Sequence, residues 1–131
     1  WDAAANGMVG LESALAVVHA AVVETGLLGW ADVARVLSTA PAHIGRLRGH
    51  GEAIAAGAAP ELTLYDPHAA SAFDVDRLAG RSSNSPYLGR TLPGRVVATF
   101  HGGYPTFFDG AVRPHDEVAR SAIEMWGPDR G

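Results

Sequence analysis

Apolar residues near the start of the chain recur at helical spacing. Four of them lie three or four residues apart and so share one face of a helix: Leu11, Leu15, Val18 and Val22. The pattern predicts a helix over residues 9–25, and Gly26 follows as a C-cap because glycine readily adopts the left-handed backbone that ends helices. This segment is therefore expected to be an amphipathic helix with one buried face.

Two further helices are predicted before residue 50. The first carries apolar residues at Trp30, Val33, Val36 and Leu37. Gly29 would be its N-cap, and the Asp32 carboxylate suits the positive end of the helix dipole. Thr39-Ala40-Pro41 then predicts a new helix start, with Ile44 and Leu47 facing inward.

The pattern changes after Gly49-His50-Gly51, where short apolar runs separated by glycine and proline replace the helical period. Glu61 to Tyr65 alternates, with Leu62 and Leu64 on one face, and predicts a half-buried strand that ends at Asp66-Pro67. The residues alone thus indicate an α/β chain with helices first and strands after.

Later in the chain, residues 95–100 and 106–108 are also predicted strands. Gly102-Gly103 separates them and Asp109-Gly110, a strong turn dipeptide, closes the second. After Arg113 the tail is predicted to form a helix through Val118, Ala122 and Met125.

Composition excludes several classes of function. With 47% hydrophobic and 18% charged residues the chain is typical of a soluble globular protein. A net charge of -4 and scattered basic residues, all arginine, argue against nucleic-acid binding. The longest apolar stretch, Leu15 to Val23, contains His19 and falls short of the roughly 20 residues that span a bilayer. The absence of Lys excludes a Schiff base, a P-loop lysine and a carbamylated lysine bridge.

Two further features bear on the cellular compartment and on whether the chain is part of a longer protein. No Cys is present, which is compatible with a reducing compartment, and we expect a cytoplasmic protein. The chain begins Trp1-Asp2-Ala3 without an initiator Met or a leader pattern, so we expect it to be a piece of a longer protein.

The search for catalytic residues predicts none in this chain. No two of the six histidines show the His-x-His or His-x-x-x-His spacing that converges on one metal ion, so no metal ligand is expected among them: His19, His43, His50, His68, His101 and His115. Ser82-Ser83-Asn84-Ser85 lacks a nucleophile elbow and precedes Pro86, which predicts a loop. Asp74 and Asp76 are expected to face water.

One segment is compatible with ligand binding. Gly7-Met8-Val9-Gly10 opens the first predicted helix, and a helix start presents unpaired N–H groups and partial positive charge to an anion. A tight turn without a ligand is the alternative interpretation.

Several motifs resemble those of bacterial dihydroorotases, members of the amidohydrolase superfamily. Ala5-Asn6 followed by Gly7-Met8-Val9-Gly10-Leu11-Glu12-Ser13-Ala14 is similar to the Gly-x-x-Gly-Leu-Glu-Thr-Ala segment after the last barrel strand. Ser38-Thr39-Ala40-Pro41-Ala42 resembles the superfamily's Thr-x-x-Pro-Ala stretch. The similarity spans about residues 4–112.

Two later motifs extend the resemblance. Gly57 to Pro67 is similar to a superfamily signature that starts with Gly and ends in Ala-Asp-Leu-x-Leu-x-Asp-Pro, with Pro60-Glu61 in place of Ala-Asp. Arg81-Ser82-Ser83-Asn84-Ser85-Pro86-Tyr87 resembles the closing Ser-x-Asn-Thr-Pro-Phe segment of dihydroorotases. Pro86 to Arg90 is also allantoinase-like, whereas Gly10 to Ala14 and Ser83-Asn84 favour dihydroorotase.

The resemblance implies an α/β fold: the C-terminal end of a (β/α)8 metal-dependent hydrolase barrel, with its outer helices, plus a small β-rich composite domain. Residues 1–49 would be the last active-site loop and outer helices, residues 50–112 the small domain, and residues 113–131 a tail. Barrel enzymes carry their active sites at the C-terminal ends of the strands. The zinc ligands and the catalytic Asp of the family would then lie outside this chain, which by itself would be inactive.

For function, the resemblance implies a zinc-dependent enzyme that interconverts carbamoyl-aspartate and dihydroorotate in pyrimidine synthesis, in which a zinc-bound water attacks the ring amide. Two backbone positions before the Gly-Leu-Glu helix contact substrate in the family, and they correspond to Asn6 and Gly7. The alternatives are an allantoinase-like or dihydropyrimidinase-like hydrolase, or an inactive homologue that acts as a scaffold for a transcarbamoylase. A homo-oligomer is compatible with each of these.

Overall fold

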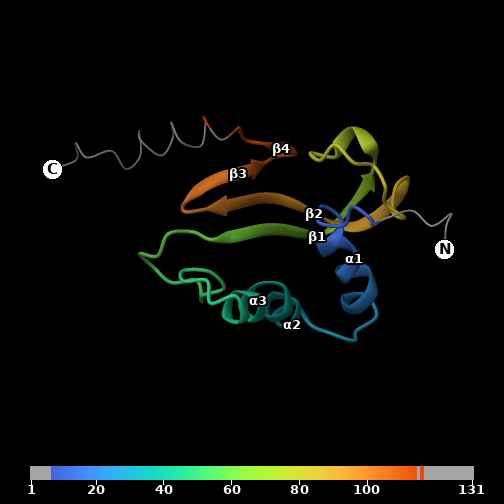
Figure 1. The fold of residues 1–131 in the computed structure, drawn as a ribbon. Coiled ribbons are helices and arrows are strands. Elements are labelled where there is room, and N and C mark those ends of the chain that lie inside the picture. Colours follow the sequence, from blue (N-terminus) through green and yellow to red (C-terminus); the bar gives the residue numbers. More distant parts are fainter. Residues whose placement is uncertain (1–6, 115, 117–131) are drawn as a thin grey trace. The chain divides into compact units, whose positions relative to one another are not determined.

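The computed structural model describes residues 7–114 and residue 116, and its secondary structure is drawn in Figure 1. The chain forms two compact units, each made of two separate segments. The first unit comprises Trp1–Trp30 and Pro67–Arg95, and the second comprises Ala31–Asp66 and Val96–Gly131. The predicted boundaries near residues 49 and 112 stay a prediction. No helix in the described part is long and apolar enough to cross a membrane.

The first predicted helix is present but begins later than its apolar pattern suggested. Helix α1 spans Ala14–Val18 and continues as the π-helical turn η1 at His19–Val23. Gly26 has a φ of 72° and its N–H donates to the Val23 carbonyl at 2.9 Å. The predicted glycine cap is therefore confirmed.

The second and third predicted helices follow one another without a loop. Helix α2 (Trp30–Ala34) leads into the π-helical turn η2 (Arg35–Thr39) and then into α3 (Ala40–Ile44). Pro41 lies in the first turn of α3, as predicted. Because proline has no N–H to donate, regular α-helical bonding is interrupted before it, and η2 occupies that interruption.

Strand β1 corrects the sequence prediction. It spans Leu62–Phe73 and so continues through Asp66-Pro67, where the strand was expected to end. In the described sheet the strand order is β1-β2-β3-β4, which places β1 at an edge. An edge strand tolerates proline because one side of its backbone needs no ladder partner. The expected stop at Pro67 was therefore wrong.

The remaining strands form an antiparallel meander. Strand β2 (Arg90–His101) pairs with β3 (Tyr104–Phe108), which pairs with β4 (Ala111–Val112). The two predicted turns are confirmed, since both residues of each turn have positive φ: Gly102 and Gly103, then Asp109 and Gly110. Both long strands extend further than alternation alone indicated.

The buried core is small in both units. In the first unit Ser13, His19 and Leu92 are buried, and the His19 ring lies 4.9 Å from that of Trp30. In the second unit the buried residues are Val33, Ala42 and Ala98.

Several apolar residues that the pattern placed inside are exposed. Leu11 is 94% exposed and Ile44 81%, and Leu47 is exposed as well. The inward orientation predicted for Ile44 and Leu47 was therefore wrong. Helical periodicity identifies an apolar face, but burial requires a second element to cover it, and in neither unit does a described element cover these residues. The predicted tail helix at Val118, Ala122 and Met125 lies outside the described residues.

Candidate functional site

The loop that precedes α1 contains one of the two predicted substrate contacts. Gly7 has a φ of 74°, is exposed, and would place an added Cβ within 4 Å of no other atom. Asn6 lies outside the described residues, as does His115. The space beside Gly7 is thus open on the side where a side chain would project.

Asn84 holds this loop from a distant part of the sequence. Its side-chain Nδ2 donates to the Gly7 carbonyl, and its own carbonyl accepts the Val9 N–H at 2.8 Å. These two bonds fix the backbone on both sides of Met8. Asn84 of the Ser-Asn motif, which was noted for its resemblance to dihydroorotases, therefore holds the loop before α1 in the first unit.

The Glu12-Ser13 pair ties α1 to the same region. The two carboxylate oxygens of Glu12 accept the N–H groups of Ala79 (3.1 Å) and Gly80 (3.3 Å). Ser13 is buried, and its Oγ donates to the Gly10 carbonyl at 3.2 Å. Both polar side chains of this motif therefore position backbone and are not arranged for catalysis.

The predicted loop at residues 82–85 and the predicted exposure of Asp74 and Asp76 agree with the structure. Residues 82–85 form no helix or strand, and the Ser85 Oγ accepts the Tyr87 N–H at 3.3 Å in a local turn. Asp74 and Asp76 are exposed, as expected.

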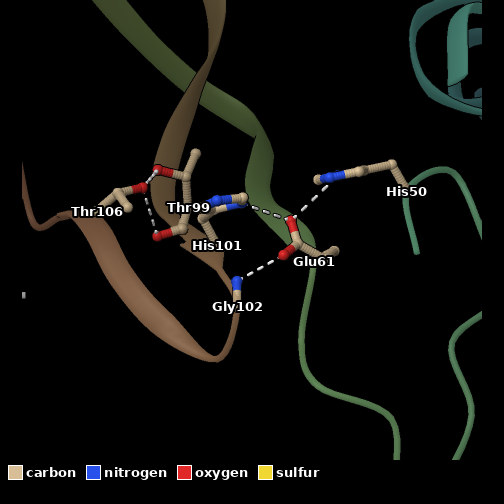
Figure 2. Close-up of polar contacts among 6 residues, drawn as sticks. All are labelled: His50, Glu61, Thr99, His101, Gly102 and Thr106. Atoms are coloured by element: carbon tan, nitrogen blue, oxygen red, sulfur yellow. Dashed lines mark hydrogen bonds and ion pairs between the residues drawn. The ribbon is translucent and has the colours of Figure 1, made fainter. Parts of the chain in front are cut away.

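A cluster of ionisable residues that the sequence did not predict lies in the second unit. The Glu61 carboxylate oxygen Oε2 lies 3.0 Å from His101 Nδ1 and 3.5 Å from His50 Nδ1 (Figure 2). The two imidazole rings stack with centroids 5.8 Å apart and planes 11° apart. We call these three residues the His-Glu-His cluster.

Glycines and the β2–β3 turn place the cluster's side chains. Gly51, next to His50, packs so closely on the preceding helix that an added Cβ would lie 2.8 Å from Ala42 Cβ. On the other side, the Gly102 N–H donates to Glu61 Oε1 at 2.5 Å, and the Gly103 N–H donates to the Pro60 carbonyl at 3.1 Å. The β2–β3 turn thus holds both the Glu61 carboxylate and the backbone just before it at Pro60.

The charge state of Glu61 follows from these contacts. Burial acts to raise the pKa of this carboxyl, but the hydrogen bonds from His101 and the Gly102 N–H and the charges of His101 and His50 outweigh burial. The pKa of Glu61 is therefore below its ordinary value. The carboxylate form, which can accept hydrogen bonds or bind a cation, is favoured.

Local spacing could not reveal this cluster, because His50, Glu61 and His101 are far apart in the sequence and converge only when β2 returns beside the start of β1. The ligand atoms of the three residues all lie within 4.8 Å of one another, so the described residues contain one group that could hold a metal ion. The expectation that no histidine here is a metal ligand stays a prediction. A glycine directly after each histidine, Gly51 and Gly102, was the one available signal.

Comparison with known proteins identifies similar sequences. No protein-family model matches the chain. It is 68% identical over 112 residues to the dihydroorotase of Leifsonia xyli subsp. xyli, 51% over 110 residues to that of Streptomyces coelicolor, and 43% over 113 residues to that of Mycobacterium tuberculosis. These alignments cover 84–86% of this chain and 26% of each relative.

One solved structure has a similar fold. The structure of a D-hydantoinase matches with a TM-score of 0.72 at 22% identity, covering 85% of this chain and 24% of that one. At this identity the match shows the fold alone: an α/β chain with a small antiparallel sheet, like the matching part of the hydantoinase. The chain spans about a quarter of the length of the curated relatives it matches. Over most of its length, this chain resembles the C-terminal part of bacterial dihydroorotases, as its motifs predict.

Proposed function

We propose that this chain is the C-terminal part of a dihydroorotase, a cyclic amidohydrolase that interconverts carbamoyl-aspartate and dihydroorotate in pyrimidine synthesis. The observation that carries the proposal is the 68% identity over 112 residues to a protein named dihydroorotase. We use "complete protein" for the product of the whole reading frame that contains residues 1–131. We place it in the cytoplasm, with a small-molecule substrate.

Exposed large apolar residues in each of the two units support a place for this chain within a larger fold. We propose that residues 1–49 form the last active-site loop and outer helices of a (β/α)8 barrel, that residues 50–112 belong to a small β-rich domain, and that residues 113–131 form a tail. Leu11 and Ile44 would then pack against barrel elements in the complete protein, each contributing about 1.5–3 kcal/mol of burial. Exposed apolar residues of this size support such a partner element.

The substrate contact is proposed at the backbone of Asn6 and Gly7. Dihydroorotate carries a carboxylate, and α1 begins only at Ala14, so the proposed donors are backbone N–H groups of the loop and not those of a helix start. The open space beside Gly7 and the two bonds from Asn84 that hold the loop support this assignment. In this proposal Asn84 is a positioning residue, because it acts on the substrate only through Gly7 and Val9.

The zinc of the proposed enzyme would be held elsewhere. Within the described residues of the unit that contains Gly7, no three histidine or carboxylate side chains converge as metal ligands. We propose that the ligands of the catalytic zinc precede Trp1 in the complete protein, as the resemblance to dihydroorotases implies. Residues 1–131 by themselves are accordingly expected to be inactive.

The upstream reading frame tests this proposal directly. A dihydroorotase requires a His-x-His pair early in the complete protein and an Asp-x-Ala-Pro-His segment shortly before Trp1. Absence of the His-x-His pair would overturn the zinc-hydrolase proposal and favour an inactive homologue that serves as a transcarbamoylase scaffold or assembles with its own kind. Presence of both motifs, with dihydroorotase activity lost when the first His pair is changed to Ala, is the expected result.

A further inference from the structure

We propose that the His-Glu-His cluster is a binding site for one divalent transition-metal ion of the Zn²⁺ class, separate from any catalytic zinc. The Nδ1 atoms of His50 and His101 converge on the same oxygen of Glu61, and the three ligand atoms lie within 4.8 Å of one another. Figure 2 shows both rings directed at the carboxylate.

The donor set matches the chemistry of this metal class. Imidazole nitrogen and carboxylate oxygen are ligands that Zn²⁺ and its neighbours prefer, at about 2.0–2.2 Å. Ligand atoms on a tetrahedral ion at those lengths lie about 3.4 Å apart, which is close to the 3.0 and 3.5 Å between Glu61 Oε2 and the two histidine Nδ1 atoms. All three ligand atoms lie within 4.8 Å of one another, so side-chain adjustment alone can bring them around one ion. The His101 side chain is 68% exposed and that of His50 41%, so both rings have room to turn, and water can complete the coordination.

The backbone beneath the cluster is already arranged. Gly51 seats the His50 loop on the preceding helix, while Gly102 and Gly103 attach the β2–β3 turn to the Pro60-Glu61 segment. Since little backbone order has to be gained on binding, the entropic cost of assembling three ligands is low. An ion here would fasten the loop after α3 to the β2–β3 hairpin, so its expected role is to stabilise the second unit.

Metal content and thermal stability test the proposal. The protein is purified as its natural reading frame encodes it, without a histidine tag, depleted of metal with a chelator, and titrated with ZnCl₂. The variants are H50A, E61Q and H101A, and the matched controls are H43A and E52Q, an exposed histidine and an exposed carboxylate outside the cluster. Bound zinc is measured by elemental analysis.

The wild type and both controls are expected to retain one more zinc per chain than each cluster variant. Added zinc should raise the thermal midpoint of the wild type and both controls by about 2 °C or more beyond any rise seen in the cluster variants. Equal zinc content in all six proteins, or a thermal response that the cluster variants share, would overturn the proposal. Catalytic activity is not the readout, so loss of the proposed function leaves this test intact.

A conservative variant guards against misfolding. H101N keeps a side-chain N–H that can donate to Glu61 but replaces a good metal ligand with a poor one. If the cluster is a metal site, H101N has the wild-type circular dichroism spectrum and lacks the additional zinc. If the cluster is only an ion pair, H101N binds as much zinc as the wild type.

Discussion

At the scale of single residues, the polar members of the dihydroorotase-like motifs hold backbone segments in place. Glu12 satisfies two N–H groups of the segment at Ala79 and Gly80, and Asn84 holds the loop at Gly7 and Val9. The resemblance located these residues, but it did not reveal what they bind. Their partners lie about seventy positions away in the sequence, a separation that no local pattern can bridge.

The double acceptor role of Glu12 predicts the effect of an isosteric change. In E12Q one oxygen becomes an NH₂ group, which cannot accept a hydrogen bond, so one backbone N–H loses its partner. Because the site is exposed, we expect a loss of about 0.5–1 kcal/mol, lowering the thermal midpoint of the complete protein by about 1–3 °C. E24Q, at an exposed position in the turn after η1, is the control and should change nothing measurable.

Gly51 and Gly49 form a matched pair for the close approach beside His50. Both have positive φ, of 66° and 75°, so alanine costs about 1–2 kcal/mol of backbone strain at either position. Only at Gly51 would the added Cβ also collide, at 2.8 Å from Ala42 Cβ and 2.9 Å from Thr39 Cα. The free energy of unfolding should therefore fall by about 1–3 kcal/mol more in G51A than in G49A. The thermal midpoint of G51A should be correspondingly lower. Equal losses would mean that the loop is not seated on the helix as described.

At the scale of elements, helical periodicity and turn dipeptides predicted most of the secondary structure. The glycine cap at Gly26 and the turn at Asp109-Gly110 depend on local backbone chemistry, so they were predictable. The continuation of β1 through Pro67 was not, because tolerance of proline depends on the strand's position at the sheet edge. The His-Glu-His cluster was missed because its three residues lie apart in the sequence and come together only in the folded second unit.

The loop before α1 gives a prediction at this scale. In N84A the bond from Nδ2 to the Gly7 carbonyl is lost, so the loop should open more often and the Val9 amide should exchange with solvent faster, by about tenfold. Hydrogen exchange followed by mass spectrometry measures this change. S82A, in the segment that also contains Asn84, is the control. If the loop positions substrate, KM of the complete protein should also rise while its thermal midpoint changes little. Unchanged exchange at Val9 would contradict the fastening role of Asn84.

At the scale of the whole molecule, many large apolar side chains of the described residues are exposed. Leu11 and Ile44 are almost fully exposed on or beside helices, and Met8, Leu27 and Ile54 are exposed as well. Side chains of this kind, when they lie together, mark surfaces that bind other protein elements. This agrees with a chain that spans about a quarter of its dihydroorotase relatives.

The purified 131-residue chain is therefore expected to be partly molten or to aggregate. Its near-ultraviolet circular dichroism should be weak, and it should bind a dye for apolar surface. A monomer with a sharp, reversible thermal transition in the absence of zinc would contradict this dependence on further protein elements. The complete protein, measured in parallel, should unfold cooperatively.

The substrate preference of the complete protein tests the proposed dihydroorotase function most directly. Ring opening and closure are measured on dihydroorotate and carbamoyl-aspartate, with allantoin and dihydrouracil as competing cyclic amides, at equal enzyme concentration. We expect the complete protein to convert dihydroorotate with a kcat/KM at least about a hundredfold above that for allantoin and dihydrouracil, because only a site built for its carboxylate gains that contact. A preference for allantoin or dihydrouracil, or no turnover of any of them, would contradict it.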